Sequence, residues 1–441
     1  MSPSKSSRRD FLRRSATAAG TGVVAPYIWT SSHAKAESKN DRLIAGCIGN
    51  GGMGHGDGQA VARYADVVAV CDVDRSHAES AKNHPQIGKG KAEIYSDYRK
   101  LLDRPDVDVV TISTPDHWHS RICIAAMKAG KDVYCQKPLT LTIDEGKILC
   151  RVLEQTGRVF QVGTQQRSEN GNMFLKAVAM VQLGRIGKVK RVTCAIGGGP
   201  AGGPFQKTDP PPGLDWDQWL GQTPLVDYIR QRCHGDFRWW YEYSGGKMTD
   251  WGAHHVDVAQ WAIGMDHSGP TTVEGLSVTH PVALKDGMPT EDDKFNTATG
   301  FMIKCMFPGD VEMRIRHDTD NGILFEGEKG RFFVDRGKLV GEAVEALRDD
   351  PLPENFLIKL RKGKPYNNHM GNFIDCVKDR STPISDLPTH HRTMTTCHLA
   401  NMAIRLGRKL TWDPQIEQIV SDDEANAWQK RPQRRGYEVE A

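Results

Sequence analysis

Residues 43–72 read LIAGCIGNGGMGHGDGQAVARYADVVAVCD. The stretch starts with an apolar run at residues 43–48, which is typical of a buried strand, and continues into a glycine-rich loop. A helix is predicted from this loop to residue 64, followed by a second apolar strand at residues 66–71 that ends at Asp72. Strand, G-x-G-x-x-G, helix, strand and acid thus follow in the order that a dinucleotide-binding site requires.

Each part of this motif has a physical role. Gly49 permits the tight turn, Gly51 lets the backbone approach the pyrophosphate, and Gly54 allows close packing of helix and strand. The helix N-terminus stabilises phosphate charge. Asp72 stands where a carboxylate accepts hydrogen bonds from the adenine ribose and repels a 2′-phosphate, so we expect NAD, while Arg75 leaves NADP open. The predicted cofactor loop comprises Gly49, Asn50, Gly51, Gly52, Met53 and Gly54.

Strands and helices continue to alternate after Asp72. Apolar strands are predicted at residues 107–113, 131–135 and 158–162, with helices between them. This alternation predicts a doubly wound parallel sheet, whose ligands lie beyond the carboxyl ends of the strands. The loops expected at that edge are Thr114 to His119 (TPDHWH), Gln136-Lys137-Pro138, and Gly163 to Arg167 (GTQQR).

A second distinctive stretch is GGKMTDWGAHHVDVAQWAIG at residues 245–264. In a helix Asp250, His254 and Asp257 share one face, and His255 lies off that stripe and is assigned to packing. Gly264 is expected to end the helix. A polar stripe usually faces water, so this stretch alone does not identify an active site.

Together these motifs resemble the glucose-fructose oxidoreductase and inositol dehydrogenase family (Gfo/Idh/MocA). The resemblance also includes the Lys137-Pro138 step and HMGNF at residues 369–373, and it covers nearly all of the chain beyond residue 36. It implies an α/β fold in which an N-terminal Rossmann domain with a doubly wound parallel sheet precedes a C-terminal α+β domain. The second domain is expected to carry an open, mostly antiparallel sheet that forms the interface of a homo-oligomer, a dimer or tetramer.

We accordingly divide the chain into four parts. Residues 1–36 are a predicted signal peptide, and residues 40–165 are the NAD(P)-binding Rossmann domain. Residues 166–385 form the substrate and oligomerisation domain, and residues 386–441 a helix and tail that pack back on the core.

The resemblance also implies roles for single residues. Lys137 corresponds to the lysine of the family's Glu-Lys-Pro motif, and Asp250 and His254 to its Asp-x-x-x-His pair. Gln136 replaces the usual glutamate, which either favours the neutral, basic form of Lys137 or weakens cofactor placement in a non-catalytic relative. The resemblance places Thr114, Pro115 and His119 on the nicotinamide side, and the further cofactor contacts expected are Trp118, Gln136 and Lys137.

The reaction implied is reversible hydride transfer between nicotinamide and a secondary alcohol of a sugar, sugar derivative or cyclitol. We expect His254 to act as the base because an unperturbed histidine titrates near neutrality, with Asp250 orienting it and Lys137 polarising the oxygen. Two alternatives remain: a glycoside-cleaving enzyme that oxidises, eliminates and reduces with tightly bound NAD, and a non-catalytic sugar-binding protein. The predicted substrate contacts are Gln166, Arg167, Trp239 and Tyr241.

Charge and cysteine usage argue against nucleic-acid-binding, integral-membrane and metal-binding proteins. The net charge is +3, but the first 36 residues are strongly basic and the remainder carries a small negative charge, so neither nucleic-acid nor integral-membrane association is expected. The ten cysteines form no C-x-x-C pair and are interpreted as small buried hydrophobic residues. No cluster has clear metal-ligand spacing, so no metal is expected.

The basic N-terminus has its own explanation. Residues 7–13 read SRRDFLR, a twin-arginine pattern, and are followed by a weakly apolar run and an Ala34-Lys35-Ala36 cleavage site. We therefore expect a periplasmic or otherwise extracytoplasmic protein that is exported already folded.

Overall fold

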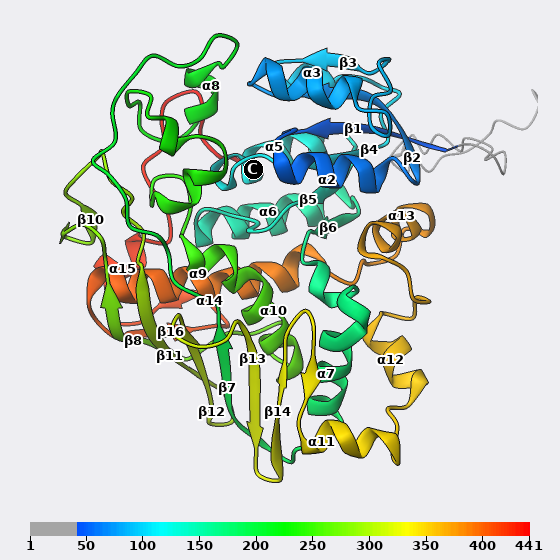
Figure 1. Ribbon diagram of the computed structural model, residues 1–441, viewed down its shortest axis with the longest axis vertical. Coiled ribbons are helices and arrows are strands. Elements are labelled where there is room, and N and C mark those ends of the chain that lie inside the picture. The colour runs from blue at the N-terminus through cyan, green and yellow to red at the C-terminus, as the bar shows by residue number, and fades with distance from the viewer. Residues whose placement is uncertain (1–41) are drawn as a thin grey trace, which may run out of the picture. The chain divides into compact units, whose positions relative to one another are not determined.

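The computed structural model describes residues 42–441 (Figure 1). The expected export signal lies outside the described residues. Within the described part, no helix is both long enough and apolar enough to cross a membrane.

The first sheet of residues 42–441 is parallel throughout, with the strand order β3-β2-β1-β4-β5-β6. The predicted doubly wound sheet is therefore confirmed. The strand order reverses between β1 and β4, which places a crevice at their carboxyl ends. The strands are β1 (Leu43–Ile48), β2 (Ala65–Cys71), β3 (Glu93–Tyr95), β4 (Val109–Ile112), β5 (Asp132–Cys135) and β6 (Phe160–Val162); the helices are α2 (Gly52–Val61), α3 (Arg75–Asn83), α4 (Tyr98–Leu102), α5 (Asp116–Lys128) and α6 (Ile143–Thr156).

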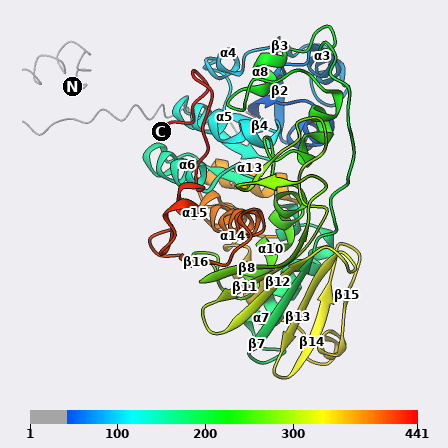
Figure 2. The ribbon, with the colours of Figure 1, turned by 90° about the vertical axis from the view of Figure 1, so that its left-hand side faces the viewer.

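The second sheet has the order β15-β14-β13-β7-β12-β11-β8-β16-β17, and within the described chain its only parallel pair is β7 with β12 (Figure 2). The expected mostly antiparallel sheet is thus confirmed. Buried residues alternate with more exposed ones along β11 and β12, because one face packs on helices. The strands are β7 (Val189–Ala195), β8 (Thr272–Thr279), β11 (Gly300–Phe307), β12 (Val311–Arg316), β13 (Gly322–Gly327), β14 (Gly330–Val334), β15 (Leu339–Val340), β16 (Leu410–Asp413) and β17 (Gln418–Ile419); β9 (Leu284–Lys285) and β10 (Met288–Pro289) form a separate hairpin.

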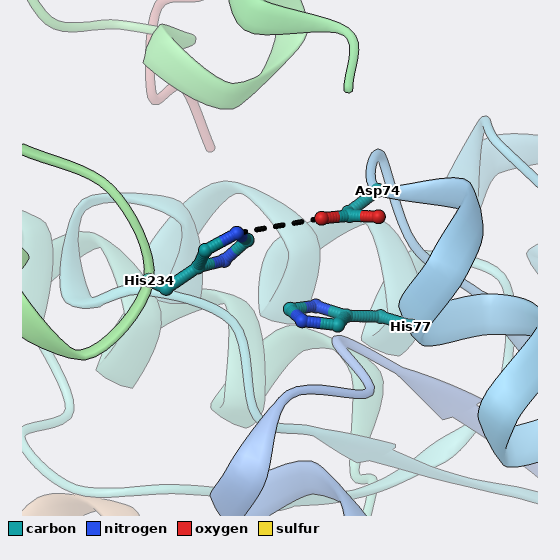
Figure 3. Close-up of side chains that lie close together, drawn as sticks. All are labelled: Asp74, His77 and His234. Atoms are coloured by element: carbon teal, nitrogen blue, oxygen red, sulfur yellow. Dashed lines mark ion pairs between the residues drawn. The ribbon is translucent and has the colours of Figure 1, made fainter. Parts of the chain in front are cut away.

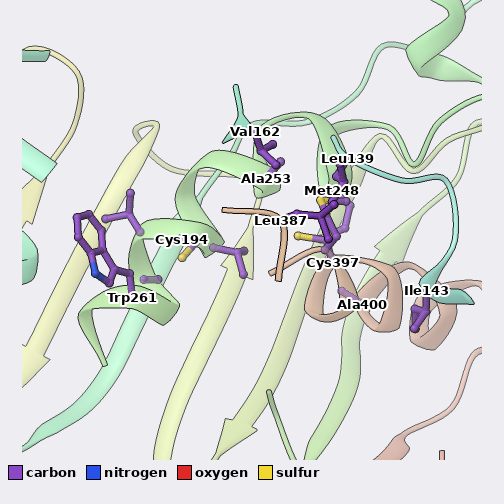
Figure 4. Close-up of a cluster of buried hydrophobic side chains, with 14 of the residues drawn as sticks. Leu139, Ile143, Val162, Cys194, Met248, Ala253, Trp261, Leu387, Cys397 and Ala400 are labelled. Atoms are coloured by element: carbon purple, nitrogen blue, oxygen red, sulfur yellow. The ribbon is translucent and has the colours of Figure 1, made fainter. Parts of the chain in front are cut away.

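Helices join the two sheets through one apolar core (Figure 4). It contains Val162 of β6, Met248 of α9, Cys194 of β7 and Cys397 of α14. All ten cysteines are free thiols and only Cys150 is half-buried, which confirms their interpretation as core residues. The remaining helices are α7 (Met173–Gln182), α8 (Trp216–Leu220), α9 (Lys247–Asp250), α10 (Gly252–Ala262), α11 (Glu342–Glu345), α12 (Glu354–Leu360), α13 (His369–Asp379), α14 (Leu387–Leu406) and α15 (Asp423–Ala427).

The segment that follows β7 returns to the edge of the first sheet. Residues 197–213 form no helix or strand, and Leu214 then pairs with Asp74 just beyond β2. Trp216 and Trp219 stack at 4.8 Å in a buried aromatic cluster. Short 3₁₀ turns follow at Arg230–Arg232 and His234–Trp239, and the second of these reaches the cofactor crevice.

Candidate active site

The glycine-rich loop lines a cavity of about 320 Å³ at the carboxyl ends of the first sheet. Gly54 lies so close to the start of the loop that an added Cβ would stand 2.0 Å from the carbonyl oxygen of Gly49. No side chain caps the N-terminus of α2, so its backbone N–H groups remain available to an anion. The predicted cofactor residues that line the cavity are Gly49, Gly51, Gly52, Met53, Asp72, Thr114, Pro115, Trp118, Gln136 and Lys137.

Three predicted cofactor residues lie behind this lining. Gly54 serves packing, and Asn50 uses its side-chain amide to donate to the carbonyl oxygens of Cys47 and Cys71. Both ring nitrogens of His119 face carbonyl oxygens, Thr114 at 2.8 Å and Pro138 at 2.7 Å. His119 therefore ties together the two loops that form the nicotinamide side and does not itself face the cavity.

Asp72 is held rigidly at the end of β2. Its carboxylate accepts the backbone N–H groups of Asn50 at 2.6 Å and of Asp74 at 2.9 Å. Thr114 lines the same cavity, and its buried Oγ1 has no hydrogen-bond partner among residues 42–441. The fixed carboxylate, the uncapped helix and this free hydroxyl fit the ribose, pyrophosphate and nicotinamide parts of a dinucleotide.

Two histidines that the sequence did not single out, His77 and His234, line the cavity near Asp72 (Figure 3). His234 Nε2 lies 3.4 Å from Asp74 Oδ2, and the His77 and His234 rings are 4.6 Å apart. The Asp72 carboxylate, 3.7 Å from His77 Nδ1, raises the pKa of His77, whereas burial lowers that of His234. Asp74, His77 and His234 could share one metal ion, so the expectation of no metal stays a prediction.

Gln136 has a specific partner in the first domain. Its Nε2 donates to both carboxylate oxygens of Asp57 at 3.0 Å, and Ser113 Oγ donates to the same carboxylate at 2.6 Å. Burial raises the pKa of Asp57 to about 6, although these hydrogen bonds act in the opposite direction. A glutamate at position 136 would place a second carboxylate against Asp57. The departure from the family pattern therefore has a local structural cause.

Lys137 pairs with Asp250 across the two domains. The distance from Lys137 Nζ to Asp250 Oδ1 is 2.5 Å, and that to the backbone oxygen of Asp250 is 3.2 Å. Burial acts to raise the pKa of Asp250, but the charges of Lys137 and Arg238 outweigh it and the pKa is lowered. Asp250 thus supplies Lys137 with the neighbouring carboxylate that Gln136 does not provide.

His254 occupies a different environment from the one expected. It is 4% exposed, its Nδ1 has no hydrogen-bond partner, and no bond to Asp250 forms. Burial, followed by the charges of Lys137 and Arg336, lowers the pKa of His254 well below its usual value. The expected orientation by Asp250 is corrected, because that carboxylate binds Lys137 and lies 3.4 Å from Arg238. His254 is therefore a neutral imidazole beside cations.

Two predicted substrate residues are held inside the protein. Arg167 is 1% exposed and forms a two-pronged ion pair with Asp257, at 2.7 and 2.8 Å. Tyr241 is 2% exposed, its hydroxyl lies 3.1 Å from His280 Nε2, and the Arg405 guanidinium covers its ring. Both assignments are corrected to structural roles, because neither side chain presents a free polar group to a ligand.

The other two predicted substrate residues lie near His254. In the amide orientation that satisfies both of its neighbours, Gln166 donates to the backbone oxygen of His254 and accepts from Arg336 Nε, each at 3.2 Å. Gln166 is buried, so it positions these groups and makes no direct contact with a substrate. Trp239 is half-buried, and Lys247 Nζ lies 5.7 Å from the centre of its ring.

Asp116 is a further site residue that the sequence left unassigned. It lines the cofactor cavity, accepts a hydrogen bond from Ser244, and is influenced by the charges of Lys137 and Arg238. Burial raises the pKa of Asp116 to about 7. The position of Asp116 in the TPDHWH loop indicated a site residue. Only the structure shows the burial that raises its pKa.

Two family descriptions match most of the described chain. Residues 42–164 match "Oxidoreductase family, NAD-binding Rossmann fold", and residues 203–439 match "Oxidoreductase family, C-terminal alpha/beta domain", both of the Gfo/Idh/MocA family. Two similar proteins are an inositol 2-dehydrogenase of Klebsiella pneumoniae (32% identical, 63% of this chain and 72% of that one) and a myo-inositol 2-dehydrogenase of Thermotoga maritima (27%, 77% and 89%). An uncharacterised oxidoreductase of Bacillus subtilis, YrbE, is 27% identical, but the match spans about half of either chain (51% and 55%). With several inositol 2-dehydrogenases the match covers less than half of the relative's length (43%).

Solved structures share the fold. A myo-inositol 2-dehydrogenase of Lactobacillus plantarum superposes with a TM-score of 0.55 at 17% identity, covering 84% of this chain and 99% of that one. The WlbA dehydrogenase of Bordetella pertussis gives 0.60 at 17% identity, covering 86% and 99%. The nucleotide fold, the site at the carboxyl edge of its sheet and both family matches lead to one conclusion: this chain belongs to the Gfo/Idh/MocA family of oxidoreductases and carries its NAD-binding Rossmann domain.

Proposed function

We propose that this protein transfers hydride between NAD and a secondary alcohol of a sugar, sugar derivative or cyclitol. The observation that carries the proposal is the Lys137–Asp250 pair, because Lys137 also lines the cavity formed by the glycine-rich loop. The similarity to inositol 2-dehydrogenases supports a polyhydroxylated substrate.

One set of residues would bind the cofactor, and another would hold the substrate oxygen and accept its proton. Bound NAD supplies the hydride acceptor, and the glycine loop, Asp72 and the uncapped end of α2 would hold it. Lys137, fixed by Asp250, donates a hydrogen bond to the reacting oxygen and stabilises its negative charge. His254 stays neutral and so can accept the hydroxyl proton, although its lowered pKa makes it a weaker base than an exposed histidine.

Absorbance of the nicotinamide provides the test. The cofactor that co-purifies is identified first, and sugars, inositols and other polyols are then screened for a change at the reduced-nicotinamide band. We expect Lys137→Ala and His254→Ala each to lower kcat by about 100-fold or more while NAD still binds. His255→Asn is the matched control, because His255 bonds Asn321 away from the pair. Near-normal rates in both variants would refute the assignment.

The same experiment separates the two alternatives. Cleavage of an aryl glycoside without added NAD would indicate an oxidation-elimination cycle with retained cofactor. Sugar binding with no absorbance change under any substrate would indicate a non-catalytic binding protein. The hydrogen bonds between Gln136 and Asp57 argue against the second, because they give the unusual glutamine a structural role.

We also propose export of the folded protein by the twin-arginine route and assembly into a dimer or tetramer through the second sheet. Export is supported by the SRRDFLR pattern, and fusion of the first 36 residues to a reporter tests it. Replacement of Arg8 and Arg9 by lysine should abolish transport; continued transport would contradict the proposal. Light scattering of the purified protein measures the assembly, and a monomer would contradict that part.

A further inference from the structure

Two cations beside the catalytic pair have no carboxylate partner. Arg336 lies on the turn after β14, and Lys247 begins α9. Among the described residues, neither makes an ion pair within 4.0 Å, whereas Lys137 and Arg238 both lie near Asp250. Arg336 and Lys247 also do not line the cofactor cavity, so the cofactor's phosphates do not account for them.

The two cations share an aromatic platform. The Arg336 guanidinium carbon lies 4.6 Å from the centre of the Trp251 ring, and Lys247 Nζ lies 5.9 Å from the same ring. Lys247 is also 5.7 Å from Trp239, and both indoles remain partly exposed. An indole can cover the apolar face of a sugar ring. The platform thus combines sugar-stacking surface with positive charge.

This platform adjoins the reacting groups. Gln166 links Arg336 Nε to the backbone of His254, and Trp251 lies between Asp250 and the helix that carries His254. The charge of Arg336 acts on His254, and Asp250 and Glu169 act on Arg336. Four cations, Lys137, Arg238, Lys247 and Arg336, therefore face three carboxylates, Asp116, Asp250 and Glu169, which leaves a positive surplus next to the reaction centre.

Resting on the proposed function, we propose that the substrate is an acidic sugar, whose carboxylate is bound by Arg336 and Lys247. Gln166 occupies Arg336 Nε, which leaves the two terminal nitrogens of the guanidinium to form paired hydrogen bonds with a planar carboxylate. The carboxylate offsets the surplus charge and brings the sugar ring to Trp239, because the Arg336 guanidinium already lies over Trp251, so that a hydroxyl reaches Lys137 and His254.

Pairs of sugars that differ only at C6 provide the test. Glucuronate is compared with glucose, and galacturonate with galactose, for kcat/KM and for the rise in Tm of the NAD-loaded protein. We expect at least one uronate to exceed its neutral partner by about tenfold or more in kcat/KM, with the advantage shrinking as NaCl is added. Arg336→Met and Lys247→Met should each remove most of the advantage, measured as the ratio of kcat/KM for the uronate to kcat/KM for its neutral partner. The charge-matched control is Arg316→Met, because Arg316 ends β12 and its ion-pair partner is Asp318.

The outcomes distinguish this inference from the proposed function. Oxidation of neutral sugars without a uronate advantage, or an advantage that survives both substitutions, would overturn the inference and leave the dehydrogenase intact. A uronate-specific rise in Tm that depends on Arg336, without any change in nicotinamide absorbance, would uphold the inference and refute the proposed function. A larger effect from glucose 6-phosphate than from glucuronate would overturn the carboxylate in favour of a phosphate.

Discussion

Replacing Gln136 by glutamate should make the stability of the protein depend steeply on pH. The new carboxylate would stand in place of an amide nitrogen that lies 3.0 Å from both oxygens of Asp57. Two charges at that distance repel by about 5 kcal/mol at an effective dielectric constant of 20. Protonating Asp57 costs less than this, because its pKa is already about 6.

The expected loss of stability follows from the pKa of Asp57. In the wild-type protein the pKa of Asp57 is raised from 3.8 to about 6, so the stability from its protonated form is complete below about pH 4 and is lost as the pH rises through 6. In the Gln136→Glu variant Asp57 must stay protonated, so the loss of stability relative to wild type grows with pH. We expect a difference of about 0.2 kcal/mol at pH 5.5, about 1.4 kcal/mol at pH 7 and about 2.7 kcal/mol at pH 8.

Urea unfolding followed by circular dichroism at these three pH values measures the effect. The matched control is Gln136→Glu with Asp57→Asn, which restores an amide donor opposite the carboxylate and should remove the pH-dependent part. A pH-independent loss, or a double variant with the same slope as the single one, would refute the explanation of Gln136.

Three further predictions follow from the site and the core. Asp72→Ala should weaken NAD binding by about tenfold or more and NADP binding less, because the carboxylate that repels a 2′-phosphate is gone; equal losses in titration calorimetry would place the ribose elsewhere. Arg167→Met should cost about 3–5 kcal/mol in urea unfolding by leaving Asp257 buried and unpaired, and Arg167→Met with Asp257→Leu should recover most of it; no recovery would mean that the pair is not the cause. Dialysis against EDTA should leave NAD binding and activity unchanged, and stoichiometric zinc in the pure protein that disappears in His234→Ala would contradict the absence of a metal.

The first domain and its cofactor loop could be predicted because their signals are local. The Gly49–Gly54 loop, the apolar strands and Asp72 lie within one short stretch, and each acts through backbone geometry that neighbouring residues determine. Lys137 was placed at the carboxyl end of its strand for the same reason. The prediction of substrate contacts was partly wrong, because Arg167 and Tyr241 are both buried. A position in or near a loop does not show whether a side chain points outward.

The amino-acid sequence by itself determined the Rossmann sheet, its glycine-rich loop and the place of Lys137 after its strand, because strand periodicity and the glycine spacing specify these locally. Only the tertiary structure decided which polar groups meet: Asp57 with Gln136, Asp250 with Lys137, and Arg336 with Gln166 beside His254. These partners come from distant segments, and the protonation of each group depends on burial and on charges a few ångströms away. Neither distance nor burial can be read from the spacing of residues along the chain, so the protonation of these groups follows from the packing of the folded protein.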